Sequence, residues 1–327
     1  MPKIPAKISR TIAIELVRVT EVAARAAVRH MGHGDKNALD GAAVAAMRDM
    51  LNTMDINGVI VIGEGEKDKA PMLFEGEEVG SSTGRLYGLK LDLAVDPVDG
   101  TTLAANGRSG AISVLAAAEE GQFLEAPEAW YMYKIAVGPN FDITQFDIDM
   151  KAEDLIWEAA RQKGVAPEDI TVCVLDRPRH QELIDGIRTA GARLKLISDG
   201  DVAGAIATCM PETGVDLLVG QGGSPEGVTT AAALKCLGGD IIGRLVFNDE
   251  AALQSAKTYG VHDPDHVYTM EEMAAGEVMF AATGVTSGSF LKGVTKVPGG
   301  EKSYSVVMRS KTGTVRWVET FHREDKK

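Results

Sequence analysis

Long apolar runs and an excess of positive charge are both missing from this sequence of 327 residues. No segment reaches the roughly 20 continuous apolar residues that a membrane-spanning helix needs. The formal net charge of −13 would repel nucleic acid and anionic lipid over most of the surface. We therefore expect no nucleic-acid partner and no membrane contact. An anionic substrate would need a local patch of positive charge.

Cysteine is scarce, and the three cysteines are Cys173, Cys209 and Cys236. They are far apart, odd in number and surrounded by apolar residues, so we interpret them as reduced core thiols. The N-terminal stretch is basic, but charged residues such as Glu15 interrupt its apolar positions, which argues against a signal peptide. We therefore expect a cytoplasmic protein.

Several familiar cofactor and nucleophile motifs are also absent. The chain contains no GxxxxGK[ST], no GxGxxG after a strand, no GxSxG and no CxxC. Nucleotide binding, dinucleotide binding, serine-esterase chemistry and dithiol redox chemistry therefore lose their usual support.

The first 150 residues predict helices followed by strands with short connections. Apolar residues at helical spacing indicate a helix from an N-cap at Ser9 to Gly32, and a second from about 38 to 54. The alternating strand at 87–95 is expected to break at Asp96-Pro97. The other strands predicted in this half, which we interpret as α+β, are 58–62, 111–117 and 131–137.

After residue 150 strands alternate with helices, which indicates a parallel, doubly wound sheet. The predicted helices are 151–163, 179–190, 201–208 and 225–236, and the predicted strands are 170–175, 194–198, 215–219, 240–247, 278–283, 304–309 and 314–320. We place a soft boundary near residue 150, between an N-terminal metal-binding half (1–150) and a C-terminal substrate-binding half (151–327) of one compact unit. Ligands bind beyond the carboxyl ends of parallel strands. The polar segments 176–180, 198–201 and 220–226 should therefore face one crevice.

The segment Asp96-Pro-Val-Asp-Gly-Thr-Thr102 is the most specific motif in the chain. Its two carboxylates can bridge metal ions, Gly100 lets the backbone approach a phosphate, and Thr101 adds a hydroxyl. An ordinary turn can have the same composition.

Acidic residues recur where strands end and helices begin. Mg²⁺ and Mn²⁺ bind carboxylate oxygens together with substrate phosphates, so this pattern indicates metal-assisted phosphoryl transfer. Glu66 lies in the same loop as Glu64, and we interpret it as solvated loop charge. The candidate ligands are Asp40, Glu64, Asp96, Asp99 and Glu226.

Two arginines in the second half have a functional and a structural interpretation of equal weight. Arg177 and Arg179 flank Pro178 at a predicted strand end. Their guanidinium groups could hold phosphate oxygens in pairs, or they could form surface ion pairs.

Two further segments also have both a functional and a structural interpretation. Asp201 could be a helix N-cap, whereas Asp199 with Gly200 could bind sugar hydroxyls. The glycine-rich stretch around Gly223 could embrace a phosphate or sugar before a helix, or could be a tight turn.

Six blocks, in order, resemble the class II fructose-1,6-bisphosphatases of the GlpX family, from about Thr11 to about His322. They are GDKNALDGAAVAAM, VIGEGEKDKAPM, DPVDGTT, DRPRH, SDGD and GGSPEGV. DPVDGT alone is shared with the wider lithium-sensitive phosphatases, including inositol monophosphatases, whereas GEGE and PEGV favour class II. The resemblance implies a layered α/β (α+β) sandwich of the sugar-phosphatase type, with a mixed N-terminal half and a doubly wound C-terminal half.

The same resemblance implies a reaction and a set of site residues. The reaction is hydrolysis of the 1-phosphate of fructose 1,6-bisphosphate, a step of gluconeogenesis, by a homo-oligomer (dimer or tetramer). The implied ligands of Mn²⁺ or Mg²⁺ are Asp40, Glu64, Asp96, Asp99 and Glu226. The implied catalytic residues are Thr101, Glu64 and Asp96. The implied substrate contacts are Asp99, Gly100, Thr101, Tyr131, Arg177, Pro178, Arg179, Asp199, Gly200, Asp201 and Gly223.

Two departures from the family pattern stand out. Asp99 occupies a position where many members carry Glu, which shortens the side chain by one methylene. An extra residue leaves either Tyr131 or Tyr133 as the substrate tyrosine, and we favour Tyr131 because Tyr-Met-x-Lys then keeps its register. Other substrates remain open, namely sedoheptulose 1,7-bisphosphate, alone or as a second substrate, and inositol monophosphate. A non-enzymatic sugar-phosphate sensor is the remote alternative.

Overall fold

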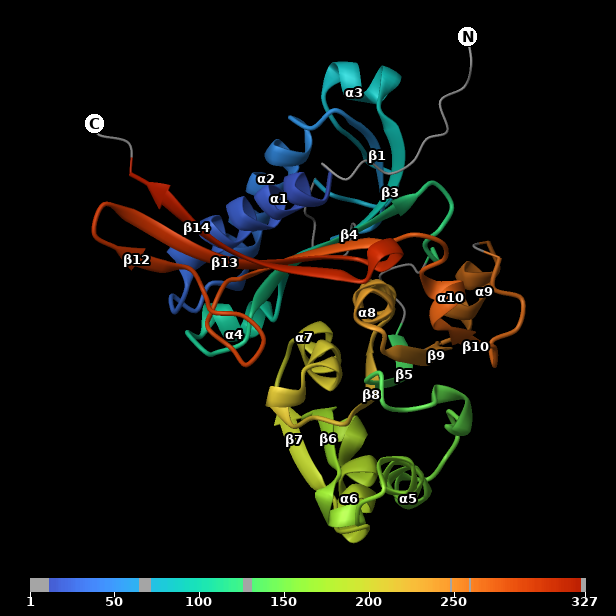
Figure 1. Cartoon of the computed structure of the whole chain (residues 1–327). Coiled ribbons are helices and arrows are strands. Elements are labelled where there is room, and N and C mark those ends of the chain that lie inside the picture. Colours follow the sequence, from blue (N-terminus) through green and yellow to red (C-terminus); the bar gives the residue numbers. More distant parts are fainter. Residues whose placement is uncertain (1–11, 65–71, 126–130, 248, 259, 325–327) are drawn as a thin grey trace.

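The computed structural model describes residues 12–64, 72–125, 131–247, 249–258 and 260–324. The predicted N-cap Ser9 and the loop residue Glu66 lie outside these ranges. The described residues form two mixed sheets with helices between them and on their outer faces, and the predicted layered α/β sandwich is confirmed (Figure 1).

In the described ranges the first sheet has eight strands, ordered β12-β13-β11-β4-β3-β1-β2, with β14 paired to β13. Helices α1 (Ile12–Ala27) and α2 (Lys36–Leu51) pack on its outer face. The Asp35 side chain caps α2 by accepting a hydrogen bond from Ala38 N. The strands are β1 (Ile56–Ile62), β2 (Glu78–Val79), β3 (Leu89–Asp99), β4 (Ile112–Glu119), β11 (Met279–Gly284), β12 (Thr295–Val297), β13 (Gly300–Arg309) and β14 (Thr314–Arg323).

The second sheet has six strands within the described residues, ordered β10-β9-β5-β8-β6-β7. Its strands are β5 (Tyr131–Val137), β6 (Thr171–Leu175), β7 (Arg193–Ile197), β8 (Leu217–Gly223), β9 (Asp240–Val246) and β10 (Val267–Thr269). Helices α5 (Ala152–Lys163) and α6 (Gln181–Thr189) pack on its outer face. The shorter helices elsewhere are α3 (Ser82–Tyr87), α4 (Thr101–Ala105), α9 (Glu250–Thr258) and α10 (Met270–Met273).

Helices α7 (Asp201–Ile206) and α8 (Ser224–Leu237) form the middle layer, between the two sheets (Figure 1). Most residues of α8 are buried, as expected for a helix covered on all sides. Three buried apolar clusters fill the gaps between the five layers. The loops that enter α7 and α8 therefore lie between the two sheets.

One prediction about a strand is wrong. Strand β3 continues through Pro97 to Asp99, with a register shift against β4 between Asp96 and Asp99, instead of ending at Asp96-Pro97. Both faces of β3 are buried, and the Asp92 carboxylate accepts hydrogen bonds from Gly121 N and Gln122 N.

The doubly wound parallel sheet is also only partly present, because β6, β7 and β8 pair in parallel while β5, β9 and β10 are antiparallel. The chain enters the second sheet with β5, before residue 150, and returns to the first sheet with β11 to β14. A cut near residue 150 would therefore separate paired strands.

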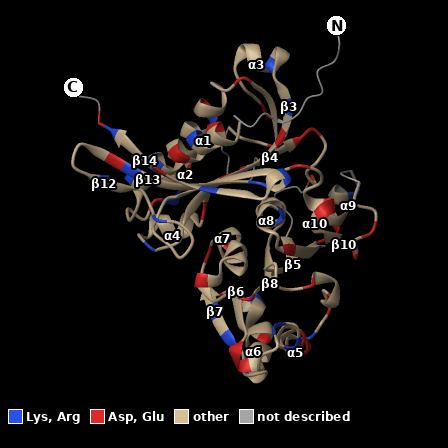
Figure 2. Ribbon diagram, in the orientation of Figure 1, with Lys and Arg blue, Asp and Glu red and all other residues tan. Residues whose placement is uncertain are grey.

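Charged residues of both signs are interspersed on the ribbon, for example along the outer helices α5 and α6 (Figure 2). None of the helices in the described ranges has the length and hydrophobicity that a membrane crossing requires.

Candidate functional site

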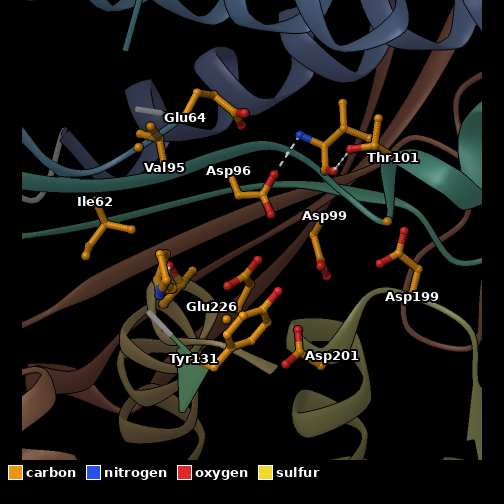
Figure 3. A pocket seen from close by; sticks show the side chains of 16 residues that line it. Ile62, Glu64, Val95, Asp96, Asp99, Thr101, Tyr131, Asp199, Asp201 and Glu226 are labelled. Carbon is orange, nitrogen blue, oxygen red and sulfur yellow. Dashed lines mark hydrogen bonds between the residues drawn. The ribbon is translucent and has the colours of Figure 1, made fainter. Parts of the chain in front are cut away.

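A pocket of about 270 Å³ brings together the ends of strands from both sheets and the starts of α7 and α8. Its acidic side chains point toward one another from separate elements (Figure 3). The predicted site residues that line it are Glu64, Asp96, Asp99, Gly100, Thr101, Tyr131, Asp199, Asp201, Gly223 and Glu226.

The last residues of β3 present two of these carboxylates, and a turn follows them directly. Asp96 Oδ1 accepts a hydrogen bond from Val98 N at 2.9 Å, and Thr101 Oγ1 donates to Val98 O at 2.9 Å (Figure 3). Gly100 has φ +86°, a left-handed conformation that glycine adopts without strain. The motif therefore forms a tight turn, and the same turn lines the pocket.

Glu64 is held by an unusual backbone contact. Leu73 is the one non-glycine residue with positive φ (+57°) in the described part of the chain, and its carbonyl accepts a hydrogen bond from Glu64 N at 3.0 Å. A Cβ on Gly63 would lie 2.0 Å from that carbonyl oxygen, so only glycine permits the approach. The buried Glu77 carboxylate accepts from Leu73 N and pairs with Arg48 of α2. This chain of contacts orients Glu64 from outside the pocket.

The loop before α7 joins the two halves of the pocket. Asp199 Oδ2 accepts from Thr102 N at 3.2 Å, and Asp99 Oδ2 accepts from Ala203 N at 3.4 Å. The loop before α7 and α7 itself thus bind the start of α4 and the end of β3 directly.

Negative charge in this pocket is poorly compensated. Burial, followed by the charges of Asp99, Glu64, Glu226 and Asp40, raises the pKa of Asp96 well above its usual range. Burial and three neighbouring carboxylates, of which Asp201 has the largest effect, likewise raise the pKa of Asp99. The described residues that line the pocket include no Lys, Arg or His. The arrangement is therefore one that a bound cation would stabilise.

The donors suit a hard divalent cation, because they are carboxylate oxygens that face a shared pocket. A Cβ on Gly223 would lie 1.9 Å from Glu226 Oε2, so glycine is required for Glu226 to occupy its present position. No three acidic, His or Cys side chains of the described residues already converge at ligating distance. An ion would have to draw carboxylates from separate elements together.

Other predicted residues lie around the pocket rather than in its lining. Asp40 projects from α2 and acts on Asp96 through its charge. Gly200, with φ +82°, lines the neighbouring cavity on the other side of Asp199.

The Arg177-Pro-Arg179 turn reaches the pocket through Tyr131. The Arg179 guanidinium lies 5.5 Å from the ring centre of Tyr131, and its Nη2 donates to Gln221 O at 2.7 Å. Arg177 and Pro178 precede α6 and lie outside the lining. The turn is thus at the rim of the pocket beside Tyr131.

The two candidate substrate tyrosines lie in different surroundings. Tyr131 lines the pocket, whereas Tyr133 packs against the apolar cluster beneath α5 and α6. The structure therefore favours Tyr131 as the residue nearer to a bound ligand.

The sequence analysis missed three buried polar residues, Glu77, Lys134 and His180. Lys134 is 1% exposed and donates to Asp201 Oδ2 at 2.6 Å. His180 bridges Leu175 O and Gln221 N. A single Lys in the apolar run Tyr131–Val137 was the signal that could have revealed Lys134.

Comparisons with known proteins agree over nearly the whole chain. Residues 10–322 match a family described as bacterial fructose-1,6-bisphosphatase, glpX-encoded. A relative from Synechocystis sp. is 41% identical, with 96% of this chain and 97% of the relative covered. A relative from Crocosphaera subtropica is 42% identical, with 96% of this chain and 97% of the relative covered. A relative from Trichodesmium erythraeum is also 42% identical, with 95% of this chain and 96% of the relative covered. All three are named D-fructose 1,6-bisphosphatase class 2/sedoheptulose 1,7-bisphosphatase.

Proposed function

Because the chain belongs to the family of bacterial, glpX-encoded fructose-1,6-bisphosphatases, we propose that it hydrolyses the 1-phosphate of fructose 1,6-bisphosphate to fructose 6-phosphate and inorganic phosphate. The family resemblance seen in the motifs is confirmed, and this is a family of metal-dependent phosphatases. The observation that carries the proposal is the single pocket in which Glu64, Asp96 and Asp99 of the first half meet Glu226 of the second.

We assign the cation as Mg²⁺ or Mn²⁺, held by a set of carboxylates that a divalent ion would neutralise. At such a site a cation offsets the charge of the phosphate and makes water more acidic. The proposed ligands are Asp40, Glu64, Asp96, Asp99 and Glu226.

Thr101 is the proposed residue that orients the attacking water. Its hydroxyl hydrogen is directed to Val98 O, so the lone pairs of Oγ1 remain available to accept a hydrogen bond from that water. A carboxylate oxygen of Glu64 or Asp96 would take the second hydrogen and remove the proton as the water attacks. Gly100 lines the pocket, and a phosphate would approach its backbone there.

The sugar and its distal phosphate would extend toward the second sheet. Arg179 uses Nε and Nη2 to bind Gln221 O, which leaves Nη1 for a phosphate oxygen at the rim, beside Arg177. Asp199 and Asp201 would accept hydrogen bonds from sugar hydroxyls. The proposed substrate contacts are Asp99, Gly100, Thr101, Tyr131, Arg177, Pro178, Arg179, Asp199, Gly200, Asp201 and Gly223.

Phosphate release from fructose 1,6-bisphosphate tests the function directly. Protein stripped of metal should be inactive and should regain turnover with Mn²⁺ or Mg²⁺. Glu226→Gln should lower kcat on the order of a hundredfold or more, because one charged oxygen donor is lost, without lowering the unfolding temperature. The exposed Glu212→Gln serves as the matched control and should retain full activity. Near-normal turnover by Glu226→Gln would remove Glu226 from the site.

A second substrate is favoured by the names of the three relatives, which include sedoheptulose 1,7-bisphosphatase. A panel with both bisphosphates and inositol 1-phosphate separates single from dual specificity. Turnover of inositol phosphate alone would contradict the fructose assignment. Tight binding of the bisphosphate without phosphate release under any metal would indicate a sensor.

We further propose a cytoplasmic homo-oligomer. The three cysteines are free thiols, which is usual in a reducing compartment. Light scattering on the peak eluted from a size-exclusion column measures the molar mass of the assembly. The mass of a monomer at the concentration used for the activity assay would contradict the proposed homo-oligomer.

A further inference from the structure

Lys134 is a cation buried beneath the acidic pocket. Its side chain is among the largest fully buried ones of the described residues, at 1% exposure, and it lies in the middle of β5. Its Nζ donates to Asp201 Oδ2 at 2.6 Å and to Gly223 O at 3.0 Å. One ammonium group therefore links the loop that enters α7 to the loop that enters α8.

This pair is costly to bury, so stability alone does not explain it. Desolvating two charges usually offsets their attraction, and apolar residues of similar volume often stabilise a core as well or better. The pair instead joins Asp201 at the start of α7 to Gly223 before α8, and both of these residues line the pocket. Its geometry, rather than its energy, is the property that a catalytic site would use.

The neighbouring backbone is shaped around the pair. A Cβ on Gly222 would lie 2.1 Å from Asp201 Oδ2 and 3.0 Å from Lys134 Nζ. Any side chain at this position of β8 would displace the Asp201 carboxylate. Gly222 therefore provides the space in which Lys134 and Asp201 meet.

We propose that Lys134 is a positioning residue for the sugar of the substrate. It binds Oδ2 of Asp201 and thereby directs Oδ1 toward the pocket, where it accepts a hydrogen bond from a sugar hydroxyl. By binding Gly223 O it also sets the distance between this carboxylate and the start of α8. The inference rests on the proposed function, because it assigns Lys134 a role in holding the same substrate.

Lys134→Met tests this role, since methionine is unbranched, of similar length and uncharged. We expect the KM for fructose 1,6-bisphosphate to rise by about tenfold to a hundredfold, with a smaller fall in kcat, because a charge-assisted contact that orients the substrate is lost. Gly222→Ala keeps both charges but pushes Asp201 away from Lys134. It should raise KM in the same way, and it decides the question if Lys134→Met does not fold.

Lys163→Met is the matched control. Lys163 Nζ lies 2.6 Å from Asp216 Oδ1, and neither residue lines the pocket. This variant should lower the unfolding temperature but leave KM unchanged. An unchanged KM in both Lys134→Met and Gly222→Ala, or an equal rise in Lys163→Met, would refute the positioning role. If the wild-type protein released no phosphate from the bisphosphate, the proposed function itself would be refuted.

Discussion

Replacing His180 by Asn would break one end of a bridge that supports the rim of the pocket. The imidazole is 3% exposed, and its Nε2 accepts a hydrogen bond from Gln221 N at 2.8 Å. Nδ1 therefore carries the hydrogen, which it donates to Leu175 O at 2.7 Å. The Asn amide can still donate toward Leu175 O, but it is too short to reach Gln221 N.

The expected loss follows from the group that is left unpaired. A backbone N–H without its acceptor costs about 1–3 kcal/mol of folding free energy. The backbone of Gln221 also binds Arg179, through its carbonyl oxygen, at 2.7 Å from Nη2. A shift of the Gln221 backbone should therefore move Arg179 as well, and raise the KM for the bisphosphate by about tenfold, or ~1.4 kcal/mol.

The pH dependence of stability should change too. Burial, with smaller effects of Arg179 and Arg177, lowers the pKa of His180 below its ordinary value of 6.5, while Leu175 O and Asp201 oppose the change. Below about pH 6.5 the unfolded chain takes up a proton that the folded chain does not, so the free energy of unfolding falls as pH falls. The slope from this residue is at most ~1.4 kcal/mol per pH unit, and His180→Asn should remove it.

Urea unfolding at about pH 5.5 and about pH 7.5, with steady-state kinetics at the higher pH, measures both effects. His322→Asn is the control, since burial also lowers the pKa of His322, which lies outside the pocket. It should flatten the pH dependence without changing KM. A His180→Asn protein with wild-type stability at the higher pH and an unchanged KM would refute the bridge.

Two further predictions concern buried polar groups. Glu77→Gln removes the charge that binds Arg48 and holds Leu73 against Glu64. In a titration of phosphate release with Mn²⁺, the apparent affinity for the ion should therefore fall by about tenfold or more. An unchanged midpoint of this titration would contradict a link between Glu77 and the metal site. Ser113→Ala removes a buried hydroxyl that has no hydrogen-bond partner among the described residues. Urea unfolding should show a free energy of unfolding higher by about 1 kcal/mol, with turnover unchanged. A lower free energy of unfolding would contradict this prediction.

Local pattern predicted the elements well. The strand expected at 131–137 has those bounds. The helix expected at 151–163 begins one residue later, as α5, and the helix expected at 225–236 is one residue longer at each end, as α8. Reasoning from strand ends and helix starts also singled out Glu64, Asp96 and Glu226, because a group of carboxylates at such positions is typical of a divalent-metal site. All three line the pocket.

Local sequence patterns could not predict which strands pair with one another over long distances in the chain. Strand β5 forms its ladder with β8 and β9, about 90 to 110 residues later, and no local feature of its sequence names those partners. Strand β3 was expected to stop at Pro97, yet a register shift lets the strand continue to Asp99.

The sequence by itself determined the chemistry of the site, since its motifs contain the carboxylates, the hydroxyl and the glycines, and their order identifies the family. The tertiary structure alone decided how these groups meet. It brought Glu226 to the end of β3, placed Tyr131 rather than Tyr133 in the lining of the pocket, and placed Lys134 against Asp201. The physical reason is that charge and burial act through space, so the electrostatic environment of a side chain depends on neighbours that can be far away along the chain.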